Sequence, residues 1–138
     1  MDVFEELVMQ YLTKNGHAHT FVCPQFSIKA ESGKEWSCPD FVALDFKNRQ
    51  VKVVEVTINS DPRKTLGKKL KQKDGQWINL LRKQLAPLGI SEESGWGFGV
   101  LAFVREEYVE AFAGSDGISV VGIETIAVPW KWDWSERR

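Results

Sequence analysis

Two runs of strand-forming residues separated by a short polar turn constrain the fold of this chain more than any other feature. Residues 40–46 and 51–59 are rich in β-branched and aromatic side chains, and the polar tetrapeptide 47–50 lies between them. Runs of this composition on either side of a short polar segment predict two antiparallel strands joined by a tight turn. The middle of the chain is therefore expected to form a β-hairpin.

Acidic residues lie at the open end of this predicted hairpin. If the turn closes on Phe46 and Val51, antiparallel pairing sets Asp40 opposite Thr57. Glu55 then lies on the same face as Asp40, as a diagonal neighbour within roughly 8 Å. Like charges at this separation repel, so such a pair needs a metal ion, a shared proton or a cationic partner. We expect a ligand between these acids.

The rest of the chain alternates between helical and strand patterns. Helices are predicted over residues 3–14, from Pro62 onward, and over 76–88 and 105–113; further strands are predicted over 19–30, 96–104 and 118–128, and residues 31–37 are predicted to be a turn or loop. The strand over 96–104 follows a helical crossover, so it should run parallel to its neighbour. The prediction is an α/β fold with an αβββαβ core and a mixed central sheet flanked by helices.

Length and composition indicate one domain. The chain has 138 residues, 43% of them hydrophobic and 27% charged, which is ordinary for a globular protein. We assign residues 1–128 to this domain and 129–138 to a Trp-rich tail. No apolar run resembles a signal peptide or a membrane span, so we expect a cytoplasmic protein without a membrane partner. Cys23 and Cys38 are expected to be free thiols, and His17 and His19 are expected to be loop residues rather than metal ligands.

The basic residues are concentrated in one part of the sequence. Residues 47–83 contain eleven Lys and Arg and three acids, although the whole chain has a net charge of −1. The densest part, residues 63–73, follows the second strand of the hairpin, and we call it the basic segment. It could hold a phosphate backbone, and the alternative is a solvated helix face. The candidate nucleic-acid-binding residues are Arg63, Lys64, Lys68, Lys69, Lys71, Lys73 and Gln76.

Two further features leave alternatives open. Glu5 lies in the first turn of the predicted N-terminal helix, where it either compensates the helix dipole or projects toward the hairpin acids. Trp130, Trp132 and Trp134 alternate along the tail. These indoles either pack on the domain or on a homodimer partner, or they stack on unpaired bases.

The motif Pro39-Asp40 followed by Glu55-Val56-Thr57 on the next strand, after a helix carrying Glu5, resembles the PD-(D/E)XK, or restriction-endonuclease-like, nuclease superfamily. Small Holliday-junction-resolvase-type nucleases are the most similar group within it. The resemblance spans residues 3–104 and implies hydrolysis of DNA phosphodiesters with Mg²⁺ or Mn²⁺.

The resemblance also implies roles for single residues. Asp40 and Glu55 match the two metal-binding carboxylates, the Val56 carbonyl matches a backbone ligand, and Glu5 matches an auxiliary carboxylate. Thr57 replaces the motif lysine, and its hydroxyl could bond the attacking water but cannot supply a positive charge.

The replacement of the motif lysine leaves two main hypotheses, an active nuclease with a lysine elsewhere and an inactive protein on the same fold. A relocated lysine would restore the charge, and the candidates are Lys29, Lys68, Lys69 and Lys71. We therefore expect an enzyme, a magnesium-dependent deoxyribonuclease. The alternatives are a catalytically inactive nucleic-acid-binding or adaptor module on the same fold and a structural interaction domain that uses the tryptophan tail.

Overall fold

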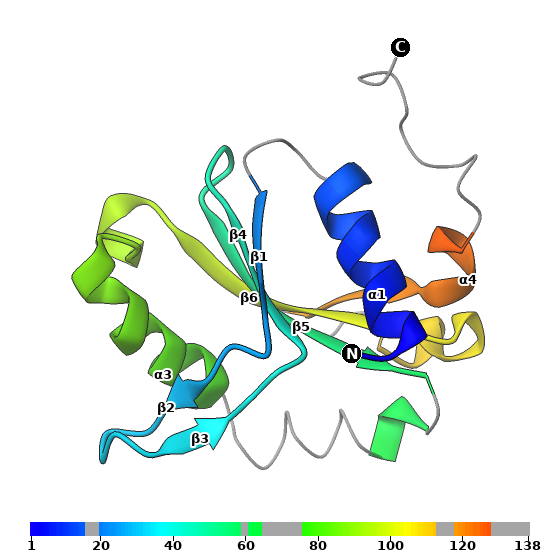
Figure 1. Cartoon of the computed structure of the whole chain (residues 1–138), viewed down its shortest axis with the longest axis horizontal. Coiled ribbons are helices and arrows are strands. Elements are labelled where there is room, and N and C mark those ends of the chain that lie inside the picture. The colour runs from blue at the N-terminus through cyan, green and yellow to red at the C-terminus, as the bar shows by residue number, and fades with distance from the viewer. Residues whose placement is uncertain (16–19, 59–60, 65–75, 113–117, 128–138) are drawn as a thin grey trace.

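The computed structural model describes residues 1–15, 20–58, 61–64, 76–112 and 118–127. Five strands form a central sheet in the order β1-β4-β5-β6-β7 (Figure 1). Their bounds are Thr20–Pro24 (β1), Phe41–Asp45 (β4), Gln50–Thr57 (β5), Gly97–Val104 (β6) and Ile118–Gly122 (β7). The α/β class and the central hairpin are confirmed.

Strand directions bring several strand ends to one edge of the sheet. β4 is antiparallel to β1 and β5, whereas β5, β6 and β7 run parallel to one another. The prediction that the strand after the helical crossover runs parallel to its neighbour is confirmed. The carboxyl ends of β5, β6 and β7 therefore lie at the edge where β4 begins. We call this the carboxyl edge, and it comprises Asp40, residues 55–57, Val104 and Gly122.

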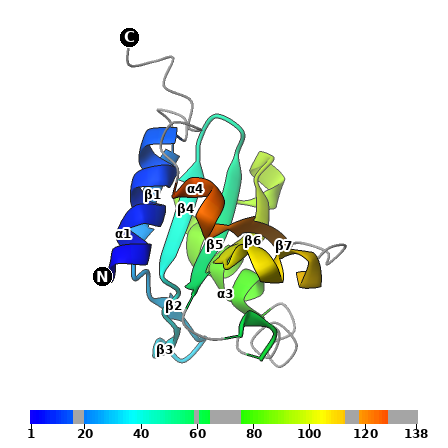
Figure 2. The same cartoon turned by 90° about the vertical axis from the view of Figure 1, so that its right-hand side faces the viewer.

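Helices cover both faces of the sheet (Figures 1 and 2). On one face lie α1 (Val3–Gln10), continued by a π-helical turn (Tyr11–Asn15), and α4 (Ile123–Ile126). On the other lie α3 (Gln76–Leu85) and the 3-10 turn Ala86–Leu88. Among the described residues, none of the helices has the length and apolar character needed to span a bilayer.

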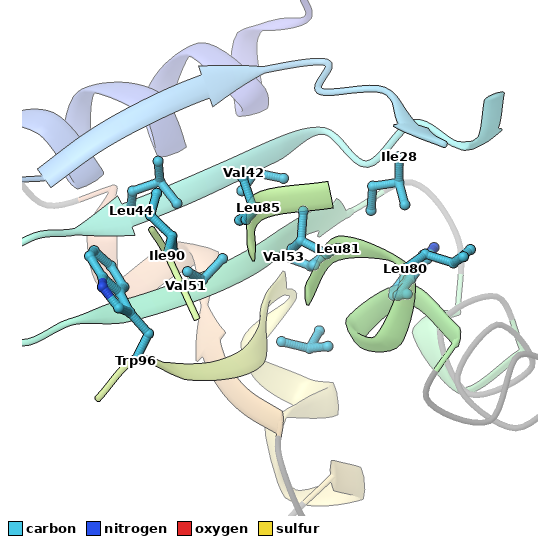
Figure 3. Packing of buried hydrophobic residues seen from close by; sticks show 12 residues of the cluster. Ile28, Val42, Leu44, Val51, Val53, Leu80, Leu81, Leu85, Ile90 and Trp96 are labelled. Atoms are coloured by element: carbon cyan, nitrogen blue, oxygen red, sulfur yellow. The ribbon is translucent and has the colours of Figure 1, made fainter. Parts of the chain in front are cut away.

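The face under α3 has the larger apolar core (Figure 3). Alternate residues of β4 and β5 point toward α3, as the period of two in a strand requires. The buried cluster comprises Ile28, Val42, Leu44, Val51, Val53, Trp77, Leu80, Leu81, Leu85, Ile90, Trp96 and Val100. The intervening residues of β4 and β5 face α1 and α4 instead, where Phe41 and Val54 are fully buried. Burial on both faces explains why the two strand sequences are almost continuously apolar.

The segment around residues 19–37 differs from its prediction. One strand over 19–30 was expected, but β1 ends at Pro24 and β2 is the short strand Ile28–Lys29. The predicted loop over 31–37 contains β3 (Glu35–Ser37), which pairs with β2. The hairpin of β2 and β3 packs on α3 through a hydrogen bond of 2.8 Å from Trp77 Nε1–H to Ser37 Oγ. These tertiary contacts stabilise a strand in a segment whose polar composition predicts a loop.

The C-terminal part differs from its prediction in two places. The helix expected over 105–113 is a 3-10 helix, Glu106–Phe112. The strand or strands expected over 118–128 consist of β7 followed by the single turn α4. An added Cβ at Gly122 would meet the flexible side chain of Glu106 and would lie 3.3 Å from the Glu106 Cα. The 3-10 helix thus packs closely against the end of β7, where glycine leaves room for it.

The turn between β4 and β5 closes two positions away from the predicted register. Asp45 pairs with Gln50, rather than Phe46 with Val51. The Asp45 carboxylate accepts hydrogen bonds from the backbone N–H groups of Lys47 and Asn48 at 3.0 and 3.1 Å, which stabilises this turn. A shift of two residues keeps every side chain on its predicted face.

Candidate active site

The corrected register brings the two central acids closer together than predicted. The last backbone pair at the start of β4 is Phe41 with Val54, so the next step along the hairpin sets Asp40 opposite Glu55. The prediction that Asp40 lies opposite Thr57 is therefore wrong. The prediction that all three residues share a face of the hairpin follows equally from the observed register.

Asp40 is held from two sides. Its backbone carbonyl accepts a hydrogen bond of 2.9 Å from the N–H of Gln25, directly after β1. Its carboxylate Oδ2 accepts a hydrogen bond of 2.8 Å from the N–H of Val56 on β5. Gln25 has a positive φ of 48°, which non-glycine residues seldom adopt. The Asp40 carboxylate is thereby fixed beside the end of β5.

Glu55 is the one buried charged residue among those described, with 7% of its surface exposed. It lies on β5 beside Ala102 of the parallel strand β6, and Ala102 is fully buried. A carboxylate taken out of water costs free energy unless a cation or hydrogen bonds compensate it. Glu55 has an interaction partner, so its carboxylate is kept inside the protein at the end of β5.

Glu5 takes part in both of the roles considered from the sequence. Asp2 and Glu5 form a capping box, in which Asp2 Oδ1 accepts from the Glu5 N–H at 2.8 Å and Glu5 Oε2 accepts from the Asp2 N–H at 3.0 Å. The Asp2 hydrogen bond lowers the pKa of Glu5, but partial burial and the adjacent Asp40 carboxylate outweigh it, so the net pKa is raised. The first turn of α1 thus adds an acid next to Asp40, and Figure 1 shows the N-terminus beside the end of β5.

Cys38 lies close enough to the acids for their charge to affect the pKa of its thiol. Desolvation raises the pKa of this thiol, and the Glu35, Asp40 and Glu55 carboxylates raise it further. The side chain is exposed on the segment between β3 and β4. The thiol therefore reports on the negative potential of the site, a property that sequence spacing did not indicate.

Neither Thr57 nor Lys29 supplies a fixed positive charge to this site. Thr57 is half-buried at the end of β5. Lys29 is exposed on β2, and within the described ranges no ion pair or hydrogen bond joins its ammonium group to Asp40 or Glu55. The relocated-lysine hypothesis therefore depends on Lys68, Lys69 or Lys71.

Most of the predicted nucleic-acid-binding residues cannot be placed. Lys68, Lys69, Lys71 and Lys73 lie outside the described residues, as do His17, His19 and the three tail tryptophans; the backbone of Gln76 begins α3, but its side chain is outside the description.

The two described residues of the basic segment are exposed. Arg63 and Lys64 lie on a helical turn over residues 62–64. Arg63 forms an ion pair of 2.7 Å with Asp61, and its guanidinium lies 5.3 Å from the centre of the Tyr108 ring. The hydrogen bonds and charge of Arg63 lower the pKa of Asp61. Half of the positive charge on this turn is therefore already compensated.

One cation at the carboxyl edge was missed from the sequence. Arg105 follows β6 directly, and its Nε–H donates a hydrogen bond of 2.8 Å to the carbonyl of Ile58, one residue beyond Thr57. A charged residue directly after a long buried strand was the signal available, because strand ends carry functional side chains in open α/β sheets.

The donor atoms suit a hard divalent cation, although the side chains do not enclose one. Mg²⁺ prefers oxygen ligands and retains several waters. Within the described residues, no group of three or more His, Cys, Asp or Glu side chains is arranged to hold a metal ion. Magnesium binding by Asp40 and Glu55 stays a prediction, as does the Val56 carbonyl ligand.

Comparisons of the chain with protein-family models, with curated proteins and with solved structures found no match.

Proposed function

We propose that this protein is a metal-dependent nuclease that hydrolyses DNA phosphodiesters, with a restriction-endonuclease-like arrangement of its core. The observation that carries the proposal is the position of Asp40 at the carboxyl edge, one residue beyond the Phe41–Val54 pair and bonded to the Val56 N–H, which sets it opposite Glu55. A helix contributing Glu5 precedes the hairpin, and a helical crossover follows it, in the order that the sequence resemblance implies.

The acids would act as oxygen ligands for Mg²⁺ or Mn²⁺. A bound metal ion lowers the pKa of a water and stabilises charge on a phosphate. Asp40 has one oxygen occupied by the Val56 N–H, which orients its carboxylate. Because Glu55 is buried, its carboxylate has little freedom to move, and water competes less with a metal ion for its oxygens. Glu5 would accept a hydrogen bond from a metal-bound water, since it adjoins Asp40.

The basic residues near the carboxyl edge favour a polyanionic substrate over a neutral one. Arg63 and Lys64 are exposed a few residues after β5. Further positive charge, at residues 68–73, follows them in the sequence after three uncharged residues. Phosphate contacts from such residues supply most of the sequence-independent affinity for nucleic acid. DNA is the substrate we propose, and a homodimer and a cytoplasmic location remain predictions.

Cleavage assays test this proposal. Purified protein is incubated with single-stranded, duplex and branched DNA and with RNA, in Mg²⁺, in Mn²⁺ and in EDTA. We expect metal-dependent DNA cleavage that Asp40→Asn and Glu55→Gln each reduce by orders of magnitude. Both changes preserve side-chain shape, and the asparagine Oδ1 can still accept from the Val56 N–H. Cleavage that both variants retain at the wild-type rate would exclude this site.

A catalytically inactive nucleic-acid-binding or adaptor module is the second candidate. Its support is the half-buried Thr57 at the position of the motif lysine, with Lys29 making no contact to the acids. This candidate predicts salt-dependent binding of DNA without turnover. The same panel separates the two functions, because any cleavage that requires Asp40 excludes the inactive module.

A further inference from the structure

Arg105 differs from the basic segment in how it is held. It is the first residue after β6, and its Nε–H donates to the Ile58 carbonyl at 2.8 Å. Val104, the residue before it, pairs with Thr57 of β5. The guanidinium is therefore fixed next to the point where β5 leaves the sheet, a few residues from Glu55.

Among the described residues, no acid forms an ion pair with Arg105, whereas two other arginines each have such a partner. Arg63 pairs with Asp61 at 2.7 Å, and Arg82 pairs with Glu92 at 2.8 Å. In the part of the chain that the structure describes, no carboxylate lies within salt-bridge distance of Arg105, and its side chain is exposed. With Nε engaged by a carbonyl, its terminal nitrogens remain available as donors. A fixed and exposed guanidinium with free donors is suited to bind a phosphate oxygen.

A second guanidinium, from the helical turn over residues 62–64, packs against the 3-10 helix that follows Arg105. The N–H of Tyr108 donates to the Arg105 carbonyl at 2.9 Å, and Arg63 lies over the Tyr108 ring. The 3-10 helix after β6 thus links Arg105 to the start of the basic segment. A nucleic-acid backbone that contacts residues 63–64 would pass this turn on its way to the carboxyl edge.

We infer that Arg105 binds a backbone phosphate of the nucleic acid at the carboxyl edge, as a fixed contact outside the basic segment 63–73. This inference rests on the proposed function, because it assumes that DNA lies across Asp40 and Glu55. Arg105 would position the strand, and no bond-breaking step is assigned to it.

The salt dependence of DNA binding tests this role. Anisotropy of a fluorescein-labelled DNA duplex is measured in Mg²⁺ over a series of NaCl concentrations, with full-length protein carrying Asp40→Asn as the parent to suppress turnover. We expect Arg105→Gln to weaken binding roughly 5- to 10-fold at low salt and to reduce the slope of log K against log salt by about 0.9, the value for one lost phosphate contact. Arg105→Lys should recover most of the slope, because it keeps the charge.

Arg49→Gln is the matched control. Arg49 is also exposed and its Nη1 donates to the Ser94 carbonyl at 2.8 Å, but it lies at the opposite end of β5. The Arg49→Gln variant should leave the slope of log K against log salt unchanged. Equal slopes for Arg105→Gln and the parent, or equal losses for Arg105→Gln and Arg49→Gln, would overturn the inference while cleavage by wild-type protein upholds the proposed function. A parent that binds no DNA together with a wild type that cleaves none would overturn both.

Discussion

The two ends of β4 each carry an aspartate, and the two aspartates have opposite surroundings. Asp45 accepts hydrogen bonds from the N–H groups of Lys47 and Asn48 and from the Asn48 side chain. All of these partners lie within three residues of it in the sequence. The Oδ2 of Asp40 instead accepts from Val56, sixteen residues away, and its other neighbours in space include Glu5.

This contrast separates an acid that shapes the chain from an acid that is available for chemistry. The Asp45 carboxylate satisfies backbone donors that would otherwise be lost in a tight turn. Asp40 lies among other acids, so part of its surroundings is repulsive in the absence of a cation. A fold maintains such repulsion at a cost, which is reasonable where the site serves a ligand.

Matched substitutions at the two aspartates should give the largest difference. Asp40→Asn should lower metal-dependent cleavage by on the order of 10³-fold, because a lost ligand forfeits several kcal/mol of charge stabilisation. Asp45→Asn should leave cleavage unchanged but reduce the free energy of unfolding by about 1 kcal/mol, since its turn hydrogen bonds weaken. Cleavage rates and urea denaturation measure the two effects. Equal losses of activity in both variants would contradict the assignment of Asp40 to the active site and of Asp45 to the turn.

The same contrast explains which parts of the fold could be predicted. The strands β4 and β5 are recognisable because their β-branched residues are continuous and bury both faces. The register could not be predicted from composition, because it depends on which residue closes the turn. Asp45 closes it through its carboxylate, and Phe46 is left to pack edge-on against Trp96, with 5.3 Å between ring centres.

Long-range contacts account for the remaining errors and omissions. β3 is polar and short, and it exists because it pairs with β2 and because Trp77, forty residues away, donates to Ser37. Asp40 and Glu55 could be proposed as a pair because strand alternation is a local property, and Glu5 was added to them through the family resemblance. Arg105 could not be linked to them, since its place depends on the parallel register of β5 and β6.

The thiol of Cys38 offers a way to sharpen the contrast without measuring catalysis. Glu35, Asp40 and Glu55 contribute to its raised pKa, so Mg²⁺ bound between the acids should lower that pKa and increase the thiolate fraction. We expect saturating Mg²⁺ to accelerate alkylation by iodoacetamide about threefold at neutral pH, because one pKa unit corresponds to about tenfold in thiolate.

Peptide mass spectrometry separates this thiol from its internal control, Cys23. Burial alone raises the pKa of Cys23, so its rate should not respond to Mg²⁺. In Asp40→Asn the response of Cys38 should be lost. A Cys38 rate that ignores Mg²⁺ in the wild type would contradict metal binding between the acids. A slower rate would place the sulfur among the ligands instead.

The smallest predicted effect concerns the repulsion between Glu5 and Asp40. Because the folded-state pKa of Glu5 is raised above its ordinary value of 4.5, the folded protein binds a proton more tightly than the unfolded chain does. The stabilisation from this proton is fully present below pH 4.5 and is lost as the pH rises through the folded-state pKa. Glu5→Gln removes the charge and keeps an oxygen for the Asp2 N–H. At neutral pH it should therefore raise the free energy of unfolding, by about 0.5 kcal/mol, since solvent screens a half-exposed carboxylate.

Glu6→Gln is the control for this prediction, because Glu6 is an exposed acid of the same helical turn. It loses only a favourable interaction with the helix dipole and should be neutral or slightly destabilising. Urea denaturation at neutral pH and below pH 4.5 should show the advantage of Glu5→Gln vanishing in acid. Saturating Mg²⁺ should also remove it, because a cation at Asp40 and Glu55 turns the field around Glu5 from repulsive to attractive. An advantage that persists in acid would mean that Glu5→Gln acts through α1 rather than through the acids of the carboxyl edge.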